Sequence, residues 1–175
     1  SDLTLAAPLV LPERGAVRVQ LHVEAPDGQG HRSVALYSRA EDAPEDGPWT
    51  AHATGTLSSP EDEASPSADP RLQVWPPAGG EPLDLTELYP RLAERGLGYG
   101  PAFQGLTEAF RVGDAVYGRV VLPASVSETA GDYGIHPALL DAALHTLAAV
   151  GLSETDASTG EVMLPFAWSD VTLHA

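Results

Sequence analysis

The first third of the chain alternates apolar and polar residues in a way that predicts antiparallel strands. Between positions 17 and 23 every second residue is apolar, so one face carries Val17, Val19, Leu21 and Val23. Period-two alternation is typical of a half-buried strand. A Pro-Asp-Gly turn at 26–28 and a second apolar run at 34–37 predict a hairpin partner. With a third strand expected at 49–57, we predict a meander without a helix.

Residues 58–82 break this pattern and predict a linker. The segment is rich in Pro, Ser and Gly and carries the acidic run 61–63. Between positions 41 and 87 the sequence has 11 acidic residues and one Arg. Like charge and few apolar side chains favour a solvated, weakly ordered connection.

The second half predicts two helices and a hairpin. Residues 84–87, Asp-Leu-Thr-Glu, have the form of a capping box, and leucines follow at helical spacing up to a glycine at position 96. Pro90 must lie near the start of this helix or bend it. Residues 107–112 and 115–122 flank a Gly-Asp turn and predict a hairpin, and Pro137 opens a helix through Val150. A last strand is expected at 171–174.

The helix at 137–150 carries the most informative polar residues. It is apolar on nearly every side, which indicates burial, yet Asp141 and His145 stand four residues apart on one face. A buried carboxylate is costly unless it is paired or functional. Two interpretations stay open: a structural Asp–His hydrogen bond, or a carboxylic acid aimed into a pocket and oriented by the imidazole.

A second signal is the loop at 99–104, Tyr-Gly-Pro-Ala-Phe-Gln. Gly98 and Gly100 allow close approach of a ligand to the backbone, Pro101 stiffens the loop, and Tyr99 offers a phenol. Taken alone, the same residues also fit an ordinary connection with a packed aromatic ring.

Composition excludes several function classes. The chain has no Cys and no Lys, which excludes thiolate nucleophiles, Cys-ligated metals, Schiff-base lysines and Walker-type phosphate loops. A net charge of −16 argues against a nucleic-acid or anionic-membrane surface. No apolar run is long enough for a membrane span and no signal peptide is apparent, so a cytoplasmic location is expected. Many Ala, Gly, Pro and Arg residues without Lys suggest a GC-rich bacterial gene.

The motifs together resemble the dehydratase domains of modular type I polyketide synthases. The resemblance rests on Tyr-Gly-Pro-x-Phe-Gln at 99–104, the His-Pro-Ala-Leu-Leu-Asp-Ala-Ala-Leu-His stretch at 136–145, and Leu-Pro-Phe-Ala-Trp at 164–168. It implies an α+β double hotdog, in which two antiparallel sheets each wrap around a central helix. Residues 1–57 would form the strand part of a first hotdog that lacks its helix here. Residues 58–82 would be the linker, and 83–175 the second hotdog with the site helix 137–150.

The resemblance also implies a reaction. The intact domain would eliminate water from a β-hydroxyacyl thioester, carried on the phosphopantetheine arm of an acyl carrier protein, to give an α,β-unsaturated thioester. Asp141 would be the general acid, and His145 would take the place of the Gln or His that orients it. The pocket would be lined by Tyr99, Gly100, Pro101, Phe103 and Gln104. No metal or other cofactor is expected. The expected partners are the carrier protein, other domains of the synthase and a second copy in a homodimer.

The family's general base is a His in a His-x-x-x-Gly-x-x-x-x-Pro motif, and this motif is absent here. Its nearest imitation starts at His52, but the glycine comes one residue early and His52 falls in a predicted strand. We therefore expect a chain truncated at the N-terminus and also at the C-terminus, which holds only the acid half of the site and is inactive alone.

Two other functions stay open. One is a hotdog without catalytic activity that binds acyl chains or a carrier protein, which the missing base favours for the chain as it stands. The other is a related double-hotdog isomerase or cyclase. Retention of Asp141 and His145 favours dehydration over isomerases that lack the acid.

Overall fold

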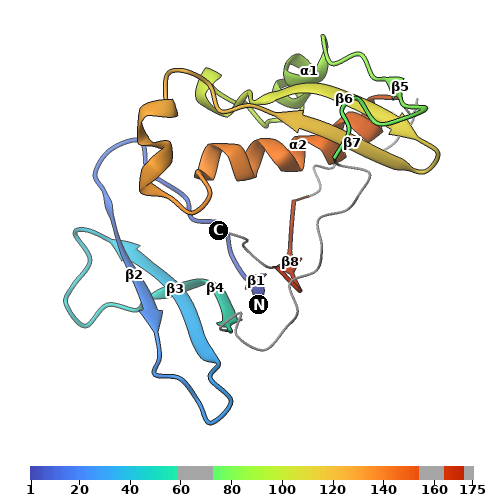
Figure 1. Ribbon diagram of the computed structural model, residues 1–175. Helices are drawn as coiled ribbons and strands as arrows, with labels where there is room; N and C mark the ends of the chain where they lie inside the picture. The colour runs from blue at the N-terminus through green and yellow to red at the C-terminus, as the bar shows by residue number, and fades with distance from the viewer. Residues whose placement is uncertain (59–72, 154–163, 172–175) are drawn as a thin grey trace. The chain divides into compact units, whose positions relative to one another are not determined.

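The computed structural model describes residues 1–58, 73–153 and 164–171, with side chains described up to Val150 in the last helix (Figure 1). The chain falls into two compact units. Residues 1–58 and 164–171 belong to the first, and residues 73–153 to the second. Each unit is built around an antiparallel sheet.

The sheet of the first unit has five strands in the order β2-β3-β4-β1-β8. The meander predicted from the alternation is confirmed as β2 (Val17–Val23), β3 (Arg32–Ala40) and β4 (Thr50–Leu57). Two short strands extend it: β1 (Asp2–Leu5) pairs with β4, and β8 (Ala167–Trp168) pairs with β1. Neither short strand was predicted. Val171 lies in no strand, and the remainder of the strand expected at 171–174 lies outside the described residues.

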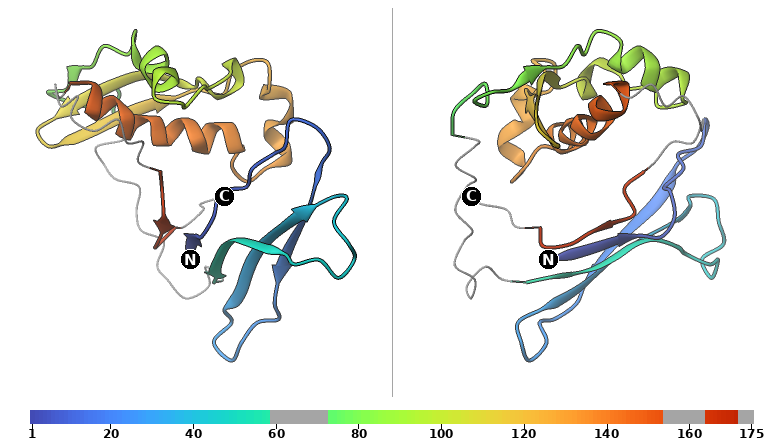
Figure 2. Two further views of the ribbon diagram at one scale, coloured as in Figure 1. Left: turned by 180° about the vertical axis from the view of Figure 1, so that it is seen from behind. Right: turned by 90° about the vertical axis from the view of Figure 1, so that its right-hand side faces the viewer.

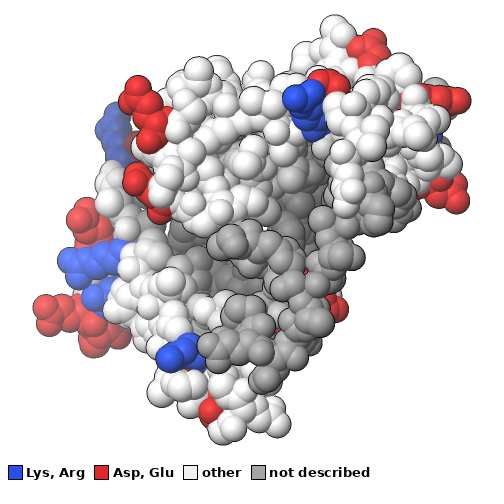
Figure 3. Space-filling model, viewed as in Figure 1, with Lys and Arg blue, Asp and Glu red and all other residues white. Residues whose placement is uncertain are grey.

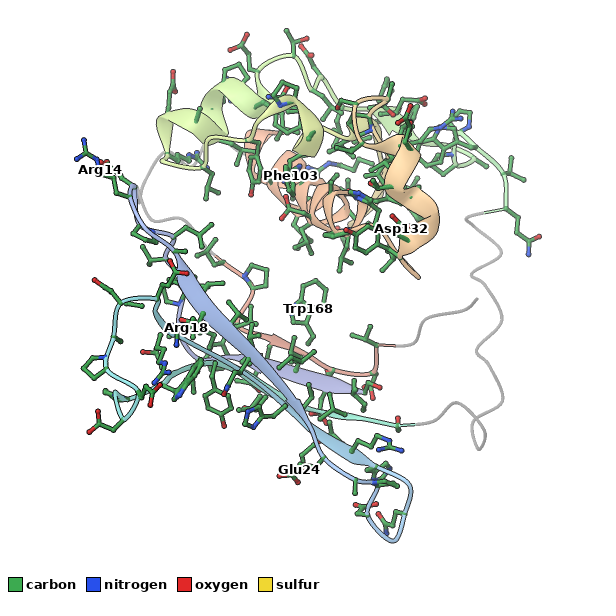
Figure 4. The ribbon with its side chains drawn as sticks, turned by 90° about the vertical axis from the view of Figure 1, so that its left-hand side faces the viewer. Arg14, Arg18, Glu24, Phe103, Asp132 and Trp168 are labelled. Carbon is green, nitrogen blue, oxygen red and sulfur yellow. The ribbon has the colours of Figure 1, made fainter. Side chains whose placement is uncertain are left out.

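One face of β2 and β3 is apolar and open among the described residues. The register pairs Leu21 with Leu36 and Val23 with Val34, so these side chains share a face. Leu21 is 64% exposed. The polar alternate positions of β2, such as Arg18, occupy the opposite face (Figure 4). Within the first unit, the described residues form no helix that could cover this face.

The second unit packs one long helix against a three-stranded sheet (Figure 2). The strands are β5 (Glu81–Pro82), β6 (Leu106–Val112) and β7 (Ala115–Val120), in that order. Helix α2 (Pro137–Ser153) lies against β6 and β7 and also contacts α1 (Leu88–Glu94). Short 3-10 helices at η3 (Pro101–Phe103) and η4 (Ser127–Asp132) join these elements. The core is formed by Leu88, Leu92, Leu106, Ala109 and Ala149.

The capping box predicted at 84–87 is wrong. The carboxylate of Asp84 accepts the backbone N–H of Thr86 at 2.9 Å, which makes a local turn, and the helix begins at Leu88 with no side-chain cap. Pro90 therefore lies in the first turn, where a missing N–H is tolerated. The predicted end is confirmed: Gly96 has φ +89°, and the N–H of Leu97 returns to the carbonyl of Leu92 at 2.8 Å. These are the contacts of a Schellman motif.

Part of the predicted linker is packed structure. The indole N–H of Trp75 donates to Glu108 at 2.7 Å, and its ring meets Phe110 edge to face. Residues 81–82 pair with β6. The ordered second unit therefore begins before residue 83, because one aromatic ring and two strand residues anchor this segment. The part of the linker at 59–72 lies outside the described residues.

Helix α2 covers the predicted site helix and continues three residues further. Ala138, Ala142 and Ala149 are buried against the sheet, but Leu147 is 71% exposed. The expectation that this helix is buried on nearly every side is therefore wrong for the described residues. At its start the ring Nδ1 of His136 accepts the N–H of Ala138 at 3.1 Å, so His136 acts as a helix cap.

Charged side chains of both signs occur on the face of the molecule that Figure 3 shows. On the face that Figure 3 shows, Arg side chains are scattered among acidic ones and the described residues form no broad basic patch. No helix in the described parts of the chain is both long and apolar enough to cross a bilayer.

Candidate active site

The structure places Asp141 and His145 in contact on α2. Oδ2 of Asp141 lies 3.4 Å from Nε2 of His145, as expected from their spacing of one helical turn. The His145 residue is 3% exposed, whereas the Asp141 side chain is 34% exposed. Neither of the two facing atoms has a hydrogen-bond partner among the described residues. The pair thus combines a buried imidazole with a carboxylate that reaches the surface.

The other ring nitrogen of His145 meets a residue that the sequence analysis missed. The hydroxyl of Tyr89, on α1, lies 3.3 Å from Nδ1 of His145 and accepts the backbone N–H of Leu106 at 3.1 Å. One signal could have identified Tyr89. It lies four residues after Leu85 and three before Leu92, on the helix face predicted to be buried, where a phenol needs a polar partner.

Tyr99 packs directly on the imidazole. The ring centroids of Tyr99 and His145 are 4.2 Å apart, with the planes tilted by 59°. The Tyr89 ring meets the same imidazole edge to face, with centroids 5.5 Å apart. His145 is therefore enclosed by two aromatic rings, with the Tyr89 hydroxyl at Nδ1 and Oδ2 of Asp141 3.4 Å from Nε2. The sequence-predicted residues Tyr99, Asp141 and His145 form one cluster.

The remaining predicted pocket residues hold the loop in shape. The Gln104 side-chain amide donates to the backbone carbonyl of Tyr99 at 2.8 Å, and the N–H of Phe103 donates to the carbonyl of Gly100 at 2.9 Å. Pro101 and Phe103 lie on η3, which packs against α2; Phe103 is exposed (Figure 4). The role of Gly100, Pro101, Phe103 and Gln104 as pocket lining stays a prediction.

Burial controls the protonation of the cluster. It lowers the pKa of His145, and the nearby Asp141 carboxylate offsets this only in part. It raises the pKa of the Tyr89 and Tyr99 hydroxyls, and the charge of Asp141 acts in the same direction. At neutral pH the imidazole is therefore neutral and both phenols are protonated. The contact between the neutral His145 ring and Asp141 is therefore a polar contact and not an ion pair.

The other described histidines have structural or exposed positions. His52 is buried in β4, where Nε2 lies 2.7 Å from the Ser38 hydroxyl and Nδ1 lies 3.1 Å from the carbonyl oxygen of Ala7. His22 and His31 are exposed or half-exposed on the first unit, and His136 caps α2. His174 lies outside the described residues. The absence of a general base among these histidines stays a prediction.

No residues suited to a metal are gathered in the described ranges. Among them, no three His, Cys, Asp or Glu side chains come together in a way that could hold an ion. A surface depression of about 320 Å³ lies between residues 82–86 and β6, and its lining includes none of the cluster residues.

Curated relatives are large synthases. The chain is 49% identical to the polyketide synthase GfsB of Streptomyces halstedii over 182 residues, which cover 99% of this chain and 3% of that protein. It is also 49% identical to the mycoketide-CoA synthase of Mycobacterium tuberculosis over 176 residues, which cover 99% of this chain and 4% of that protein. The chain thus spans a small part of each relative.

Solved structures with the same fold are dehydratase domains. The dehydratase from the terminal module of the rifamycin polyketide synthase matches 95% of this chain and 57% of that one, with a TM-score of 0.82 and 41% identity. The bifunctional dehydratase–cyclase domain of ambruticin biosynthesis matches 100% of this chain, and the match covers 58% of that domain's chain. Its TM-score is 0.77 and its sequence identity is 47%. These neighbours confirm the expected α+β double-hotdog fold, of which this chain spans about half.

Two further neighbours are variants of the CurK dehydratase that are described as inactive. One carries Asn in place of an Asp and the other carries Phe in place of a His, with 30% identity to this chain and TM-scores of 0.72 and 0.71. The family model for the polyketide synthase dehydratase N-terminal domain matches residues 67–175, which include the whole cluster. The chain therefore belongs to the polyketide synthase dehydratase family.

Proposed function

We propose that the domain containing this chain eliminates water from a β-hydroxyacyl thioester, with Asp141 as the general acid. The carboxylic acid donates its proton to the departing β-hydroxyl, so that water leaves and the Cα–Cβ double bond forms as a base removes the α-proton. The observation that carries the proposal is the Asp141–His145 pair: a partly exposed carboxylate has one oxygen 3.4 Å from a buried, neutral imidazole.

The geometry favours Asp141 over His145 as the group that meets the substrate. Because His145 is enclosed by Tyr89 and Tyr99, it has no path to a substrate, whereas a third of the Asp141 side chain is accessible. His145 therefore orients the carboxylate, and Asp141 meets the substrate. General acids and bases placed in this way typically contribute about 10²–10⁴-fold to a rate.

The base of the reaction comes from outside residues 1–175 in this proposal. Among the described histidines, His52 is buried against Ser38 and Ala7 in the first unit, and His136 caps α2 in the second. The inactive His variant of the CurK dehydratase supports the need for an imidazole in that enzyme. The chain by itself is then the acid half of the site, as the sequence led us to expect.

The partners follow from the same proposal. The relatives that cover 99% of this chain are long synthases, which supports contacts with other domains of one polypeptide. The substrate would arrive on the phosphopantetheine arm of an acyl carrier protein, and no metal or other cofactor enters the reaction. A homodimer and a cytoplasmic location remain parts of the proposal.

A direct test compares two carboxylates in the intact domain. Asp141→Asn should lower kcat for dehydration of a β-hydroxyacyl thioester by about 10²–10⁴-fold, with KM little changed. Asp132→Asn, at an exposed site in η4, is the matched control and should retain the wild-type rate. A normal rate for Asp141→Asn would overturn the assignment.

Cyclisation is a second candidate, because the ambruticin neighbour that matches the whole of this chain is a dehydratase–cyclase. Incubation with a β-hydroxyacyl thioester that also carries a distal hydroxyl separates the two functions. An unsaturated open-chain product supports dehydration alone, whereas a cyclic ether supports the bifunctional enzyme.

A further inference from the structure

Tyr89 joins three elements at one hydroxyl group. The side chain starts from α1, its oxygen accepts the N–H of Leu106 at the start of β6, and it lies 3.3 Å from Nδ1 of His145 on α2. The Tyr89 ring also packs edge to face on the imidazole. A residue that had no place in the sequence-based site therefore contacts its central imidazole in two ways.

The direction of the two hydrogen bonds at the Tyr89 hydroxyl follows from which groups can donate a proton. A backbone N–H can only donate, so the Tyr89 oxygen is the acceptor for Leu106. The hydroxyl has one proton of its own, and burial keeps that proton on the oxygen at neutral pH. A buried hydroxyl proton needs an acceptor, and the neighbouring acceptor is Nδ1 of His145. Nδ1 then carries no proton.

The protonation state of Nε2 of His145 follows from that of Nδ1. A neutral imidazole has one N–H, so an unprotonated Nδ1 requires a proton on Nε2. That N–H then faces Oδ2 of Asp141 at 3.4 Å. With the acidic proton of Asp141 on Oδ1, the oxygen that does not face the ring, the opposite tautomer would set the lone pair of Nε2 against the lone pairs of Oδ2, which is electrostatically unfavourable. The rings of Tyr89 and Tyr99 restrict rotation of the imidazole out of this arrangement.

We propose that Tyr89 is a positioning residue, whose hydroxyl holds His145 in the Nε2–H tautomer with that N–H directed at Asp141. The path runs from the Leu106 N–H through the Tyr89 hydroxyl and the imidazole to the carboxylate. Tyr89 does not touch substrate and acts only through His145. The kinetic part of the inference rests on the proposed function, but the tautomer does not.

The tautomer can be measured without any activity assay. In the intact domain labelled with ¹⁵N-histidine, two-bond ¹⁵N–¹H correlation spectra at neutral pH distinguish a protonated ring nitrogen from an unprotonated one. The His145→Gln variant identifies the His145 signals by their disappearance. We expect Nε2 protonated and Nδ1 unprotonated. A protonated Nδ1 in the wild-type domain would overturn the proposal, whatever the activity of Asp141 variants.

Tyr89→Phe removes the hydroxyl and keeps the ring. The Nδ1 signal of His145 should shift, because an accepted hydrogen bond is lost, and kcat should fall about 3- to 10-fold at unchanged KM. Tyr117→Phe is the matched control. Its neighbours Val116 and Val120 pack on the core, so Tyr117 lies on the outer sheet face and both readouts should keep their wild-type values. An unshifted Nδ1 signal in Tyr89→Phe would contradict the proposal.

A double-mutant cycle separates positioning from general stabilisation. If Tyr89 acts through His145, Tyr89→Phe should cost nothing further in kcat when His145 is already Ala. A purely structural role, through the lost partner of the Leu106 N–H, would give the same fold-loss in both backgrounds. Equal losses would therefore overturn the proposal even if Asp141 is the acid.

Discussion

Oδ2 of Asp141 and Nε2 of His145 face each other at 3.4 Å, and neither atom forms a hydrogen bond with another described residue. Two buried polar atoms without better partners are costly, because each has lost hydrogen bonds to water. The two atoms stay in this unfavourable position because both residues are fixed on neighbouring turns of α2, at positions i and i+4. The arrangement leaves the carboxylate free to exchange its contacts when a substrate hydroxyl arrives.

The first prediction concerns replacement of His145. His145→Gln should retain most of the dehydration rate, because an amide can accept from the Tyr89 hydroxyl and donate to Asp141 as the imidazole does. His145→Ala should lose about tenfold or more, since both hydrogen-bonding groups disappear. Steady-state assays of the intact domain check this. Equal, severe losses in both variants would instead indicate proton transfer by the imidazole.

The second prediction is a pH dependence of stability. The pKa of His145 is lower in the folded state than its ordinary value of 6.5, because the ring is buried. Below pH 6.5 the unfolded chain binds a proton that the folded chain does not, so the free energy of unfolding falls as the pH falls. The other titratable groups that face the ring are Asp141, Tyr89 and Tyr99, and the two phenols do not titrate in this range.

Urea unfolding at pH 7.5 and 5.5 measures this effect. The wild-type domain should lose more stability on acidification than His145→Gln, with a difference in slope of at most about 1.4 kcal/mol per pH unit. If the two proteins lose the same amount, His145 does not titrate as the structure indicates.

The third prediction tests the contact that places α2 on the sheet. A Cβ atom on Gly118 of β7 would lie 2.9 Å from Cδ1 of Leu106 and too close to the Thr146 side chain. Gly118→Ala should therefore lower the free energy of unfolding by about 1–3 kcal/mol, as overpacking does. Gly131→Ala is the control, because a Cβ there would meet nothing within 4 Å. Thermal and urea unfolding compare the two, and equal stabilities would contradict the packing described here.

Local patterns in the sequence predicted the elements whose partners are near in the chain. Alternation predicted β2 to β4, and residue spacing brought Asp141 and His145 together. The short strand β1 was not predicted from the sequence. Its partner, β4, lies about fifty residues away along the chain, and a strand of four residues shows too little periodicity to be recognised. The start of α1 was misplaced because the Asp84 side chain closes a turn with Thr86 instead of capping a helix. Tyr89 was missed because its role depends on tertiary contacts with β6 and α2.

The fourth prediction concerns the missing base. Residues 1–175 alone should show no measurable dehydration, whereas a longer chain that also contains the upstream part of the synthase should be active. Both are assayed with the same β-hydroxyacyl thioester, and circular dichroism and carrier-protein binding report whether the shorter chain is folded. Elimination by the short chain at a comparable rate would place the base within residues 1–175.

The role of Asp141 as a proton donor to the leaving group can be tested by changing that group. A β-fluoroacyl thioester is close in size to the β-hydroxy substrate, but fluoride departs as a stable anion and needs a proton far less than hydroxide does. Rates of elimination are measured for both substrates with the wild-type domain and Asp141→Asn. If Asp141 is the general acid, Asp141→Asn should lower the rate about 10²–10⁴-fold with the hydroxyl substrate and less than about tenfold with the fluoride. Equal losses with the two substrates would contradict general-acid catalysis by Asp141.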